Sequence, residues 1–367
     1  MKILEIVADL QIGGAQRVSA NIAKYAPDGT EFTYAVFDRT VGDYEAEIEA
    51  KGNRVVHISS PHNSRRFVTD LSRLLNETEY DVVHCHTMYS CGMVMLIAWL
   101  HGVPGRISHS HTALDQASGR SRLRKAYKGL MRALIHLFGT DYLSCGVDAG
   151  NELYGEHFFQ KKGVVIKNGI DTDAYRFSEK NRVAIRRELG LDDRFIIGHV
   201  GHYETVKNQA FLIRLMPEIR KQRSDAVLLL YGGGTTKDML EQEICSLHLE
   251  DHARVMGNVR NISEVLSAFD VFAFPSLFEG TPLALLEAQT NGLPCVISDR
   301  IPADACVTDL IERMPLTSPE LWTERLVDAH RKHAEDYAEV VERNYESIRR
   351  SMQELNSVFN KYIRKSE

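Results

Sequence analysis

Short apolar runs alternate with helical stretches along most of the chain, and this alternation limits the fold more than any other feature. The predicted strands of the first half are residues 3–8, 32–37, 54–58, 81–85, 106–109, 142–145 and 164–167. The pattern restarts with predicted strands at residues 195–200, 226–230, 253–256, 271–274 and 295–298. Strand, helix and strand in repetition give a parallel sheet with helices on both faces, and ligands bind beyond the carboxyl ends of its strands. The sequence therefore predicts an α/β protein with two Rossmann-like, doubly wound parallel-sheet domains.

Length and composition agree with two ordinary globular domains. The chain has 367 residues, which is enough for two domains of about 150 to 200 residues each. Its net charge of −6 argues against nucleic acid as the main partner. No stretch reaches the roughly 18 uncharged apolar residues of a membrane-spanning helix, and the first residues read as a strand rather than a signal peptide. The six cysteines form no C-x-x-C pair, so we expect a cytoplasmic protein with reduced thiols.

The boundary between the two domains is predicted near residue 170. Asn168-Gly169 is a turn dipeptide at the end of the last strand of the first half, and a polar stretch continues to Lys180. We therefore expect one domain over residues 1–170 and a second over residues 171–340.

Residues 271–299 read as a strand, a loop, a helix and a second strand. A helix that begins near Thr281 leaves its first backbone N–H groups without intrahelical partners, so the corner at Gly280 and Thr281 can hold an anion such as phosphate. Glu279 lies beside that corner, and Glu287 follows about one and a half helical turns later. A phosphate flanked by two hydroxyl acceptors describes the binding of a nucleotide sugar.

At these residues the chain resembles the donor-site signature of the retaining GT-B glycosyltransferases of family 4. The shared features are Glu279, Glu287, the sequence GTPLALLEA that includes the second glutamate, and the following NGLPCVISD. The resemblance implies that Glu279 contacts the transferred sugar, that Glu287 binds the nucleotide ribose, and that the intervening loop holds the diphosphate. It places four loop residues at the donor, namely Gly280, Thr281, Pro282 and Leu283. An amphipathic helix with two solvated acids is the alternative explanation of the same residues.

The resemblance covers nearly the whole chain and is weakest after Leu316. It implies a GT-B fold, in which two domains face each other across a cleft. The domain at residues 1–170 is expected to bind the acceptor, and the domain at residues 171–340 the nucleotide sugar. The last helices, in residues 341–367, are expected to cross back onto the first domain.

The loop after the predicted strand 195–200 carries Lys207, which is expected to open a helix and to supply a positive charge where a diphosphate would be held. Members of the family usually place an arginine after Gly201, whereas this chain has His202 there. An imidazole is shorter than a guanidinium group and only partly charged at pH 7, so catalysis here is expected to be weaker, pH-dependent or supported by another cation. An exposed lysine beside a packed histidine is the alternative.

Three further loops follow predicted strands. Gly13 and Gly14 lack the G-x-G-x-x-G spacing of a nicotinamide or flavin dinucleotide site, and the family has a similar glycine pair near the donor phosphates and the acceptor. Gly232-Gly233-Gly234 suits either a phosphate or a flexible turn. The family uses the backbone of the loop at Asn258 and Val259 against the nucleotide base.

Histidines follow the fourth and fifth predicted strands. Along a strand, His84-Cys85-His86 sends both imidazoles to one face and the thiol to the other, which disfavours a metal site built from all three. We expect His86 to line the interdomain cleft and His84 to be packed. In the sequence Ser108-His109-Ser110-His111-Thr112, the resemblance places a functional histidine, best matched by His111, and His109 is expected to be structural.

Residues 119–132 hold six basic side chains and no acidic one. Leu123, Tyr127, Leu130, Met131 and Leu134 fall at spacings that give a mostly apolar side bordered by arginine and lysine. Such a segment, about residues 119–135, is typical of a helix on an anionic membrane, and equally of a surface helix that packs one apolar stripe.

Together these features predict a retaining glycosyltransferase that moves a hexose from a nucleotide diphosphate sugar, in most such families a UDP-sugar, to a saccharide or lipid-linked acceptor. The predicted catalytic groups are His111, Lys207 and Glu279, with no metal and no cofactor. Exopolysaccharide or capsule assembly at the inner face of the plasma membrane is the expected context. A nucleotide-sugar 2-epimerase of the same fold and a non-catalytic nucleotide-sugar-binding protein remain alternatives.

Overall fold

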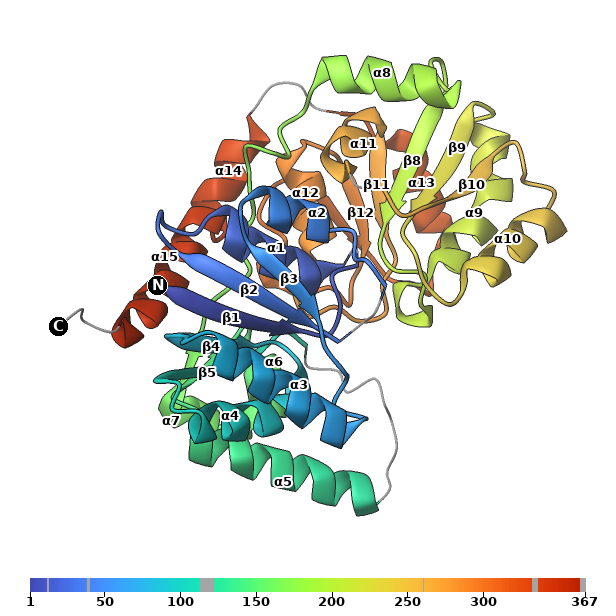
Figure 1. Ribbon diagram of the computed structural model, residues 1–367. Helices are drawn as coiled ribbons and strands as arrows, with labels where there is room; N and C mark the ends of the chain where they lie inside the picture. Colours follow the sequence, from blue (N-terminus) through green and yellow to red (C-terminus); the bar gives the residue numbers. More distant parts are fainter. Residues whose placement is uncertain (12, 38–39, 113–121, 260, 332–335, 364–367) are drawn as a thin grey trace. The chain divides into compact units, whose positions relative to one another are not determined.

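The computed structural model describes residues 1–11, 13–37, 40–112, 122–259, 261–331 and 336–363. The chain divides into two compact units, one formed by Met1–Gly169 together with Ile348–Glu367 and the other by Ile170–Ser347. Each unit has one parallel sheet with helices on its faces (Figure 1). The sequence analysis placed the domain boundary after residue 170 and the returning segment from residue 341. In the structure the chain leaves the first unit after Gly169 and rejoins it at Ile348.

The sheet of the first unit has seven strands in the order β3-β2-β1-β4-β5-β6-β7, and every neighbouring pair is parallel. The strands are β1 (Lys2–Val7), β2 (Glu31–Val36), β3 (Arg54–His57), β4 (Val82–Cys85), β5 (Gly105–Ser110), β6 (Asp141–Ser144) and β7 (Gly163–Val165). The winding runs outward from β1 in one direction and from β4 in the other. Loops that follow β1 and β4 therefore meet at the reversal point, where doubly wound sheets bind their ligands, and β5 is the next strand beside β4.

Helices cover both faces of this sheet. One face packs against α1 (Gly14–Lys24), α2 (Glu45–Ala50) and α15 (Ile348–Phe359), whose apolar side chains share a core with those of β1, β2 and β4. The other face packs against α3 (Ser64–Glu77), α4 (Cys91–Leu100), α5 (Arg122–Phe138), α6 (Val147–Tyr154) and α7 (Glu156–Lys162). Alternate residues of each strand serve the two faces, as the pleat requires.

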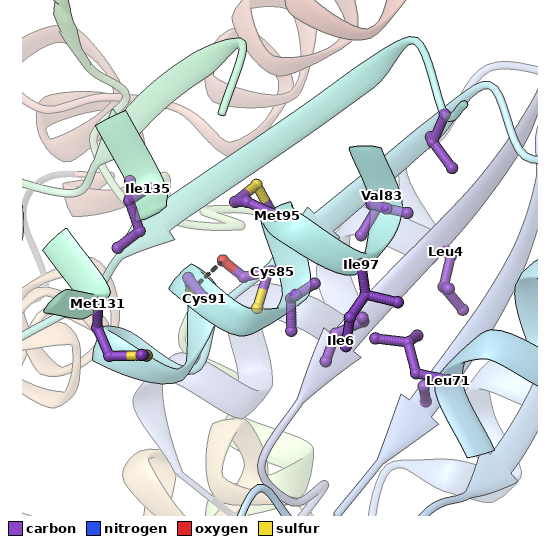
Figure 2. Packing of buried hydrophobic residues seen from close by; sticks show 14 of the residues in the cluster. Leu4, Ile6, Leu71, Val83, Cys85, Cys91, Met95, Ile97, Met131 and Ile135 are labelled. Atoms are coloured by element: carbon purple, nitrogen blue, oxygen red, sulfur yellow. Dashed lines mark hydrogen bonds between the residues drawn. The ribbon is translucent and has the colours of Figure 1, made fainter. Parts of the chain in front are cut away.

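The alternation places Cys85 in the second of these cores. Figure 2 shows its side chain among Ile6, Val83 and Met95, and Cys91 donates its thiol hydrogen to the carbonyl oxygen of Cys85 over 3.4 Å. The imidazoles of His84 and His86 consequently lie on the opposite face of β4, as the strand period predicts.

The sheet of the second unit has six strands in the order β10-β9-β8-β11-β12-β13, all parallel. The strands are β8 (Phe195–Val200), β9 (Ala226–Tyr231), β10 (Ala253–Gly257), β11 (Val271–Phe274), β12 (Cys295–Ser298) and β13 (Ile311–Met314). Winding reverses between β8 and β11. The twelve strands predicted from the sequence are confirmed, whereas β13 was missed because its sequence, IERM, has two charged residues and lies at the sheet edge.

The helices of the second unit also form two layers. One face carries α8 (Glu179–Leu189), α11 (Ile262–Ala268), α12 (Leu283–Thr290) and α14 (Tyr337–Asn344). The other carries α9 (Gln209–Gln222), α10 (Lys237–Ser246) and α13 (Pro319–Asp328). Local signals set the ends of α8, because Ser178 accepts a hydrogen bond from the backbone of Asn181 and Gly190 ends the helix at a left-handed φ of 66°.

Within the described residues, none of the helices combines the length and the apolar character that crossing a bilayer requires.

Candidate active site

Two side chains of opposite charge meet where the winding of the second sheet reverses. The ammonium nitrogen of Lys207 lies 2.7 Å and 2.9 Å from the two carboxylate oxygens of Glu279. The Glu279 side chain is 8% exposed and that of Lys207 is 20% exposed. The lysine also lies 5.6 Å from the ring centroid of Phe274, in β11. A partly buried, charge-assisted pair of this kind is stronger than an exposed ion pair.

Backbone contacts hold the two loops of this pair together. The amide of Leu277 donates to the carbonyl of Val206 over 2.8 Å, and the side-chain amide of Asn208 donates to the carbonyl of Pro275 over 3.2 Å. Lys207 ends the short 3-10 turn Thr205–Lys207, and α9 starts only after Asn208, whose φ is 56°. The prediction that Lys207 opens a helix is therefore wrong by one short turn, since Asn208 in the left-handed region separates the turn from the helix.

Helix α12 supplies the second predicted carboxylate. It begins at Leu283 with Pro282 at the N-cap, two residues later than predicted, and Pro282 accepts backbone hydrogen bonds from Leu285 and Leu286. A proline before the first turn favours this start because its φ is fixed and it has no N–H to leave unpaired. Gly280 is exposed and Thr281 is half-buried, whereas Glu287 is 6% exposed.

The glycine-rich loop after β9 packs closely on the loop after β8. A Cβ atom on Gly232 would lie 2.0 Å from the carbonyl oxygen of Gly201, and one on Gly234 would lie 2.5 Å from that of Tyr203. Both glycines have φ near 150°. The two glycines are therefore required for packing between loops, so their presence does not by itself indicate a phosphate site.

His202 and Asn258 both approach Gly233, the middle glycine of that loop. Nδ1 of the exposed His202 donates to the carbonyl oxygen of Gly233 over 3.2 Å. Two side-chain atoms of Asn258 lie 2.9 Å from the place where a Cβ atom on Gly233 would be. Val259 is half-buried beside Asn258. The structure thus gathers three of the loops predicted to contact the donor, with His202 on the solvent side.

A buried histidine cluster occupies the reversal point of the first sheet. Glu5, in the middle of β1, accepts hydrogen bonds from Nδ1 of His84 over 3.0 Å and from Nε2 of His86 over 2.7 Å. The other nitrogen of His84 lies 3.1 Å from Nδ1 of His109, and the other nitrogen of His86 lies 2.7 Å from Nε2 of His111. The structure therefore joins all four predicted histidines to one carboxylate.

Burial and neighbouring charges set the protonation of this cluster. Burial by itself raises the pKa of Glu5, but the adjacent imidazoles of His84 and His86 outweigh it and bring the pKa to about 2. Burial lowers the pKa of His86 below its ordinary value. Burial, followed by the charge of neighbouring histidines, lowers the pKa of His109 and of His111 well below the ordinary range. Glu5 is therefore ionised at neutral pH, and these three imidazoles are neutral.

Three imidazoles of this cluster lie close enough together to be considered as ligands of a metal ion. One ring nitrogen from each of His84, His86 and His109 lies within 4.8 Å of the others. Nitrogen ligands of one tetrahedral zinc ion lie about 3.3 Å apart. Both nitrogens of His84 and both of His86 already take part in hydrogen bonds within the cluster. A metal would have to break these bonds, and the absence of a metal requirement stays a prediction.

Gly13 lies in the loop that follows β1, as predicted, and is the N-cap of α1, which begins at Gly14. Its φ is −176°, an extended conformation that any residue adopts, so no left-handed turn requires glycine at this position. A close approach of a ligand to this glycine pair stays a prediction.

Sequence analysis missed two buried polar groups of these sites. Glu5 interrupts the apolar run of β1. A carboxylate inside such a buried strand could have indicated a polar partner, because a buried carboxylate must be hydrogen-bonded. His199, in β8, is completely buried and donates from Nδ1 to the carbonyl of Ala273 over 2.9 Å. Burial lowers the pKa of His199 to about 4. Its Nε2 lies 3.2 Å from where a Cβ atom on Gly201 would be, beneath the loop that carries Lys207.

Comparison with known proteins identifies the family. The model of the Glycosyltransferase Family 4 matches residues 12–174, and that of Glycosyl transferases group 1 matches residues 181–343. The protein named "Putative glycosyltransferase EpsF" of Bacillus subtilis is 31% identical over 89% of this chain and 87% of its own length. The chain belongs to glycosyltransferase family 4.

Other relatives of this glycosyltransferase carry more specific names. The capsular polysaccharide biosynthesis glycosyltransferase CapH of Staphylococcus aureus is 25% identical over 81% of this chain and 80% of its own. An Escherichia coli UDP-Gal:alpha-D-GlcNAc-diphosphoundecaprenol alpha-1,3-galactosyltransferase is 30% identical over 62% of this chain and 60% of its own.

Solved structures show the fold of this glycosyltransferase. Anabaena HepE, solved in complex with UDP and glucose, superposes with a TM-score of 0.80 at 19% identity, over 98% of this chain and 99% of that chain. The predicted GT-B fold is thereby confirmed.

Proposed function

We propose that this glycosyltransferase transfers a hexose from a UDP-sugar to a saccharide or lipid-linked acceptor, with retention at the anomeric carbon and without a metal ion. We further propose that the reaction serves exopolysaccharide or capsule assembly.

The pair formed by Lys207 and Glu279 carries this proposal. The two groups are what a nucleotide sugar needs at its reacting bond, a cation for the departing diphosphate and a carboxylate for the hydroxyls of the hexose. In the structure each neutralises the other at 2.7 Å and 2.9 Å. The donor would take over both interactions, with its phosphates on Lys207 and its hexose hydroxyls on Glu279.

Further groups of the second unit extend the same donor site. Glu287, on α12, would accept hydrogen bonds from the ribose hydroxyls. The loop Gly280, Thr281, Pro282 and Leu283 would lie along the diphosphate, and the backbone at Asn258 and Val259 along the base. His202 is exposed and donates to a carbonyl rather than to an acid, so it is available to contact a phosphate.

Names of the relatives support UDP and the polysaccharide context. The Escherichia coli relative is named for a UDP-galactose donor and a diphosphoundecaprenol-linked acceptor, and HepE was solved with UDP and glucose. CapH is named for capsular polysaccharide biosynthesis. We extend these properties to this chain as part of the proposal.

The proposed chemistry rests on electrostatic stabilisation. As the anomeric bond breaks, negative charge grows on the leaving phosphate, and Lys207 and the first turn of α12 would stabilise it. The acceptor hydroxyl would attack from the face that the phosphate leaves, and its proton would pass to the leaving phosphate, so that the configuration is retained. Because Lys207 supplies positive charge, the donor site would need no metal. In the first unit, His111, held by its hydrogen bond to His86, would hydrogen-bond a sugar hydroxyl, near the glycine pair 13–14.

Helix α5 supports a peripheral contact with an anionic membrane. Of its apolar side chains, Leu123 is 83% exposed, Leu130 57% and Leu137 73%, while Met131 and Ile135 are buried against the core. The single apolar side predicted from the sequence is therefore wrong: Met131 faces the core, Leu134 packs partly against it, and a separate stripe is open to solvent. The first turn of α5 also carries the basic residues Arg122, Arg124 and Lys125, which suit anionic headgroups. Residues 119–121 of the predicted segment lie outside the described residues.

Product analysis tests the proposal. Purified protein would be incubated with UDP-glucose, UDP-galactose and their N-acetyl forms, with and without a diphosphoundecaprenol-linked saccharide. We expect acceptor-dependent release of UDP, a glycoside with the anomeric configuration of the donor by NMR, and no effect of EDTA. A donor epimerised at C2 without acceptor would identify a 2-epimerase. Binding without any product would identify a non-catalytic protein.

A further inference from the structure

The network around Glu5 is larger than the packing of β1 requires. A carboxylate that is completely buried is costly unless hydrogen bonds satisfy it, and an apolar residue would fill this strand position more simply. Instead, two imidazoles donate to the two oxygens of Glu5. Each of them is also hydrogen-bonded to a second imidazole, which follows β5 or lies at its end. The branch through His86 ends at His111, a residue of the proposed active site.

The direction of each hydrogen bond in that branch follows from Glu5. An ionised carboxylate only accepts hydrogen bonds, so Nε2 of His86 must carry a hydrogen. Because His86 is neutral, its Nδ1 is then a bare acceptor. The 2.7 Å contact between Nδ1 of His86 and Nε2 of His111 must consequently be donated by His111. His111 is neutral as well, so its Nδ1 carries a lone pair and no hydrogen.

That last nitrogen is unpartnered. Nδ1 of His111 is buried and has no hydrogen-bond partner in the part of the chain that the structure describes. A buried acceptor without a donor costs free energy, and a hydroxyl group that donated to it would remove that cost. A phosphate oxygen, in contrast, is itself an acceptor and could not donate a hydrogen bond to the lone pair on Nδ1 of His111.

We propose that Glu5 is a positioning residue that acts through His86 to hold His111 in its Nε2-protonated tautomer, so that Nδ1 accepts a hydrogen bond from a sugar hydroxyl. The use of this site rests on the proposed function, whereas the tautomer does not. The network thereby selects hydroxyl groups and disfavours phosphate at His111. The reacting hydroxyl of the acceptor and a hydroxyl of the hexose both satisfy this chemistry.

Other groups hold the network in place without altering its direction. Through His84, Glu5 also connects to His109, and the ring of His84 contacts that of Phe359 on α15 at 5.3 Å between centroids. Nearby on the same face of the sheet, Tyr34 donates its hydroxyl hydrogen to the carbonyl of Ser19 over 2.7 Å. Tyr34 therefore offers a matched control, a buried polar group of this core that lies outside the network.

The first test needs no variant. Protein labelled with ¹⁵N-histidine would be studied by NMR at pH 7.5, with signals assigned by single substitutions to glutamine. We expect His86 and His111 each as the neutral Nε2–H tautomer. His111 as the Nδ1–H tautomer or as a doubly protonated ring would overturn the proposal. So would coordination of Nδ1 of His86 by zinc that survives dialysis against EDTA.

The second test perturbs the carboxylate. In Glu5→Gln the amide offers one donor and one acceptor, so one of His84 and His86 must accept instead of donate, and the branch beyond it must reverse. We expect a tautomer change in at least one branch and, where it reaches His111, about a tenfold or larger fall in kcat for transfer. Tyr34→Phe should change neither. Unchanged tautomers in folded Glu5→Gln would overturn the proposal.

Calorimetric binding of UDP separates this inference from the proposed function. The donor residues lie in the second unit and Glu5 in the first, so the Kd for UDP should be the same in wild type and Glu5→Gln. If the wild type binds no nucleotide, the proposed function fails and the tautomer result still stands. If UDP binds equally to both proteins while the tautomers differ from those expected, only the positioning role fails.

Discussion

Lys207 and Glu279 form a two-point ion pair, in which one ammonium group contacts both oxygens of one carboxylate at 2.7 Å and 2.9 Å. The two residues follow different strands, β8 and β11, and meet only because these strands are neighbours at the reversal of the sheet. The pair keeps a mostly buried acid neutralised in the structure described here. A bound nucleotide sugar would replace this ion pair by two interactions, one between its phosphates and Lys207 and one between its hexose hydroxyls and Glu279.

Breaking the pair from one side should cost stability as well as activity. In Lys207→Met, the 8% exposed carboxylate of Glu279 loses its cation, and we expect the free energy of unfolding to fall by about 1–3 kcal/mol. The transfer rate should fall about 100-fold or more. The double variant Lys207→Met with Glu279→Gln should lose less stability than the sum of the two single variants, because neither charge is left alone. Urea unfolding followed by tryptophan fluorescence, to which the buried Trp322 of the second unit contributes, measures this, and additive losses would contradict it.

Restoring the usual arginine at position 202 should strengthen donor binding. His202 is exposed, so the longer guanidinium group can be accommodated without repacking a core. A guanidinium group that binds phosphate through two hydrogen bonds should lower the Kd for a UDP-sugar about tenfold in His202→Arg. His157→Arg adds the same charge at an exposed position of the first unit and should leave the Kd unchanged. Equal effects of both variants would show that only net charge matters.

The second unit should lose stability in mild acid through His199. Its pKa of about 4 in the folded protein lies below the ordinary 6.5, so the unfolded chain binds the proton first and stability falls as pH drops from 6.5 toward 4. Between pH 7.5 and pH 5 this one group accounts for about 2 kcal/mol. Urea unfolding at the two pH values should show a smaller difference in His199→Asn. The exposed control His248→Asn should retain the full difference, and a difference unchanged in His199→Asn would refute the assignment.

The open stripe of α5 should mediate binding to anionic vesicles. Replacing Leu123, Leu130 and Leu137 by serine removes three exposed apolar side chains and no buried one, so the fold should persist. We expect sedimentation with vesicles that contain phosphatidylglycerol to fall about tenfold or more, and binding of the wild type to weaken with salt. Leu321→Ser, on α13 of the second unit, is the matched control. If the wild-type protein does not sediment with the vesicles, the proposed membrane contact is wrong.

The sequence was sufficient for the fold because the strands are short, apolar and separated by helical stretches. Each of the twelve predicted strands is present within one or two residues of its expected ends. The one strand missed among the described residues, β13, has two exposed charged residues between two half-buried apolar ones, and it lies at the edge of its sheet. The strand forms by pairing with β12, and the local sequence of Ile311–Met314 does not predict that pairing.

The candidate site was predictable in its residue types and less so in its contacts. Lys207, Glu279 and Glu287 could be named from their loops and from the family resemblance. Their ion pairing and the start of α12 at Leu283 depend on how two loops pack. The histidines were singled out one by one, whereas their common partner, Glu5, lies 79 residues before His84 in the chain. Only the parallel pairing of β1 with β4 brings Glu5 next to His84.

The central claim is that the second unit binds a UDP-sugar with Glu287 on the ribose, and calorimetric titration tests it most directly. UDP, GDP and ADP would each be titrated, with and without hexose, into wild type, Glu287→Ala and the exposed control Glu250→Ala. We expect UDP to bind most tightly to wild type and to the control, and at least about tenfold more weakly to Glu287→Ala. Absence of nucleotide binding, or equal binding of UDP by Glu287→Ala, would contradict this account.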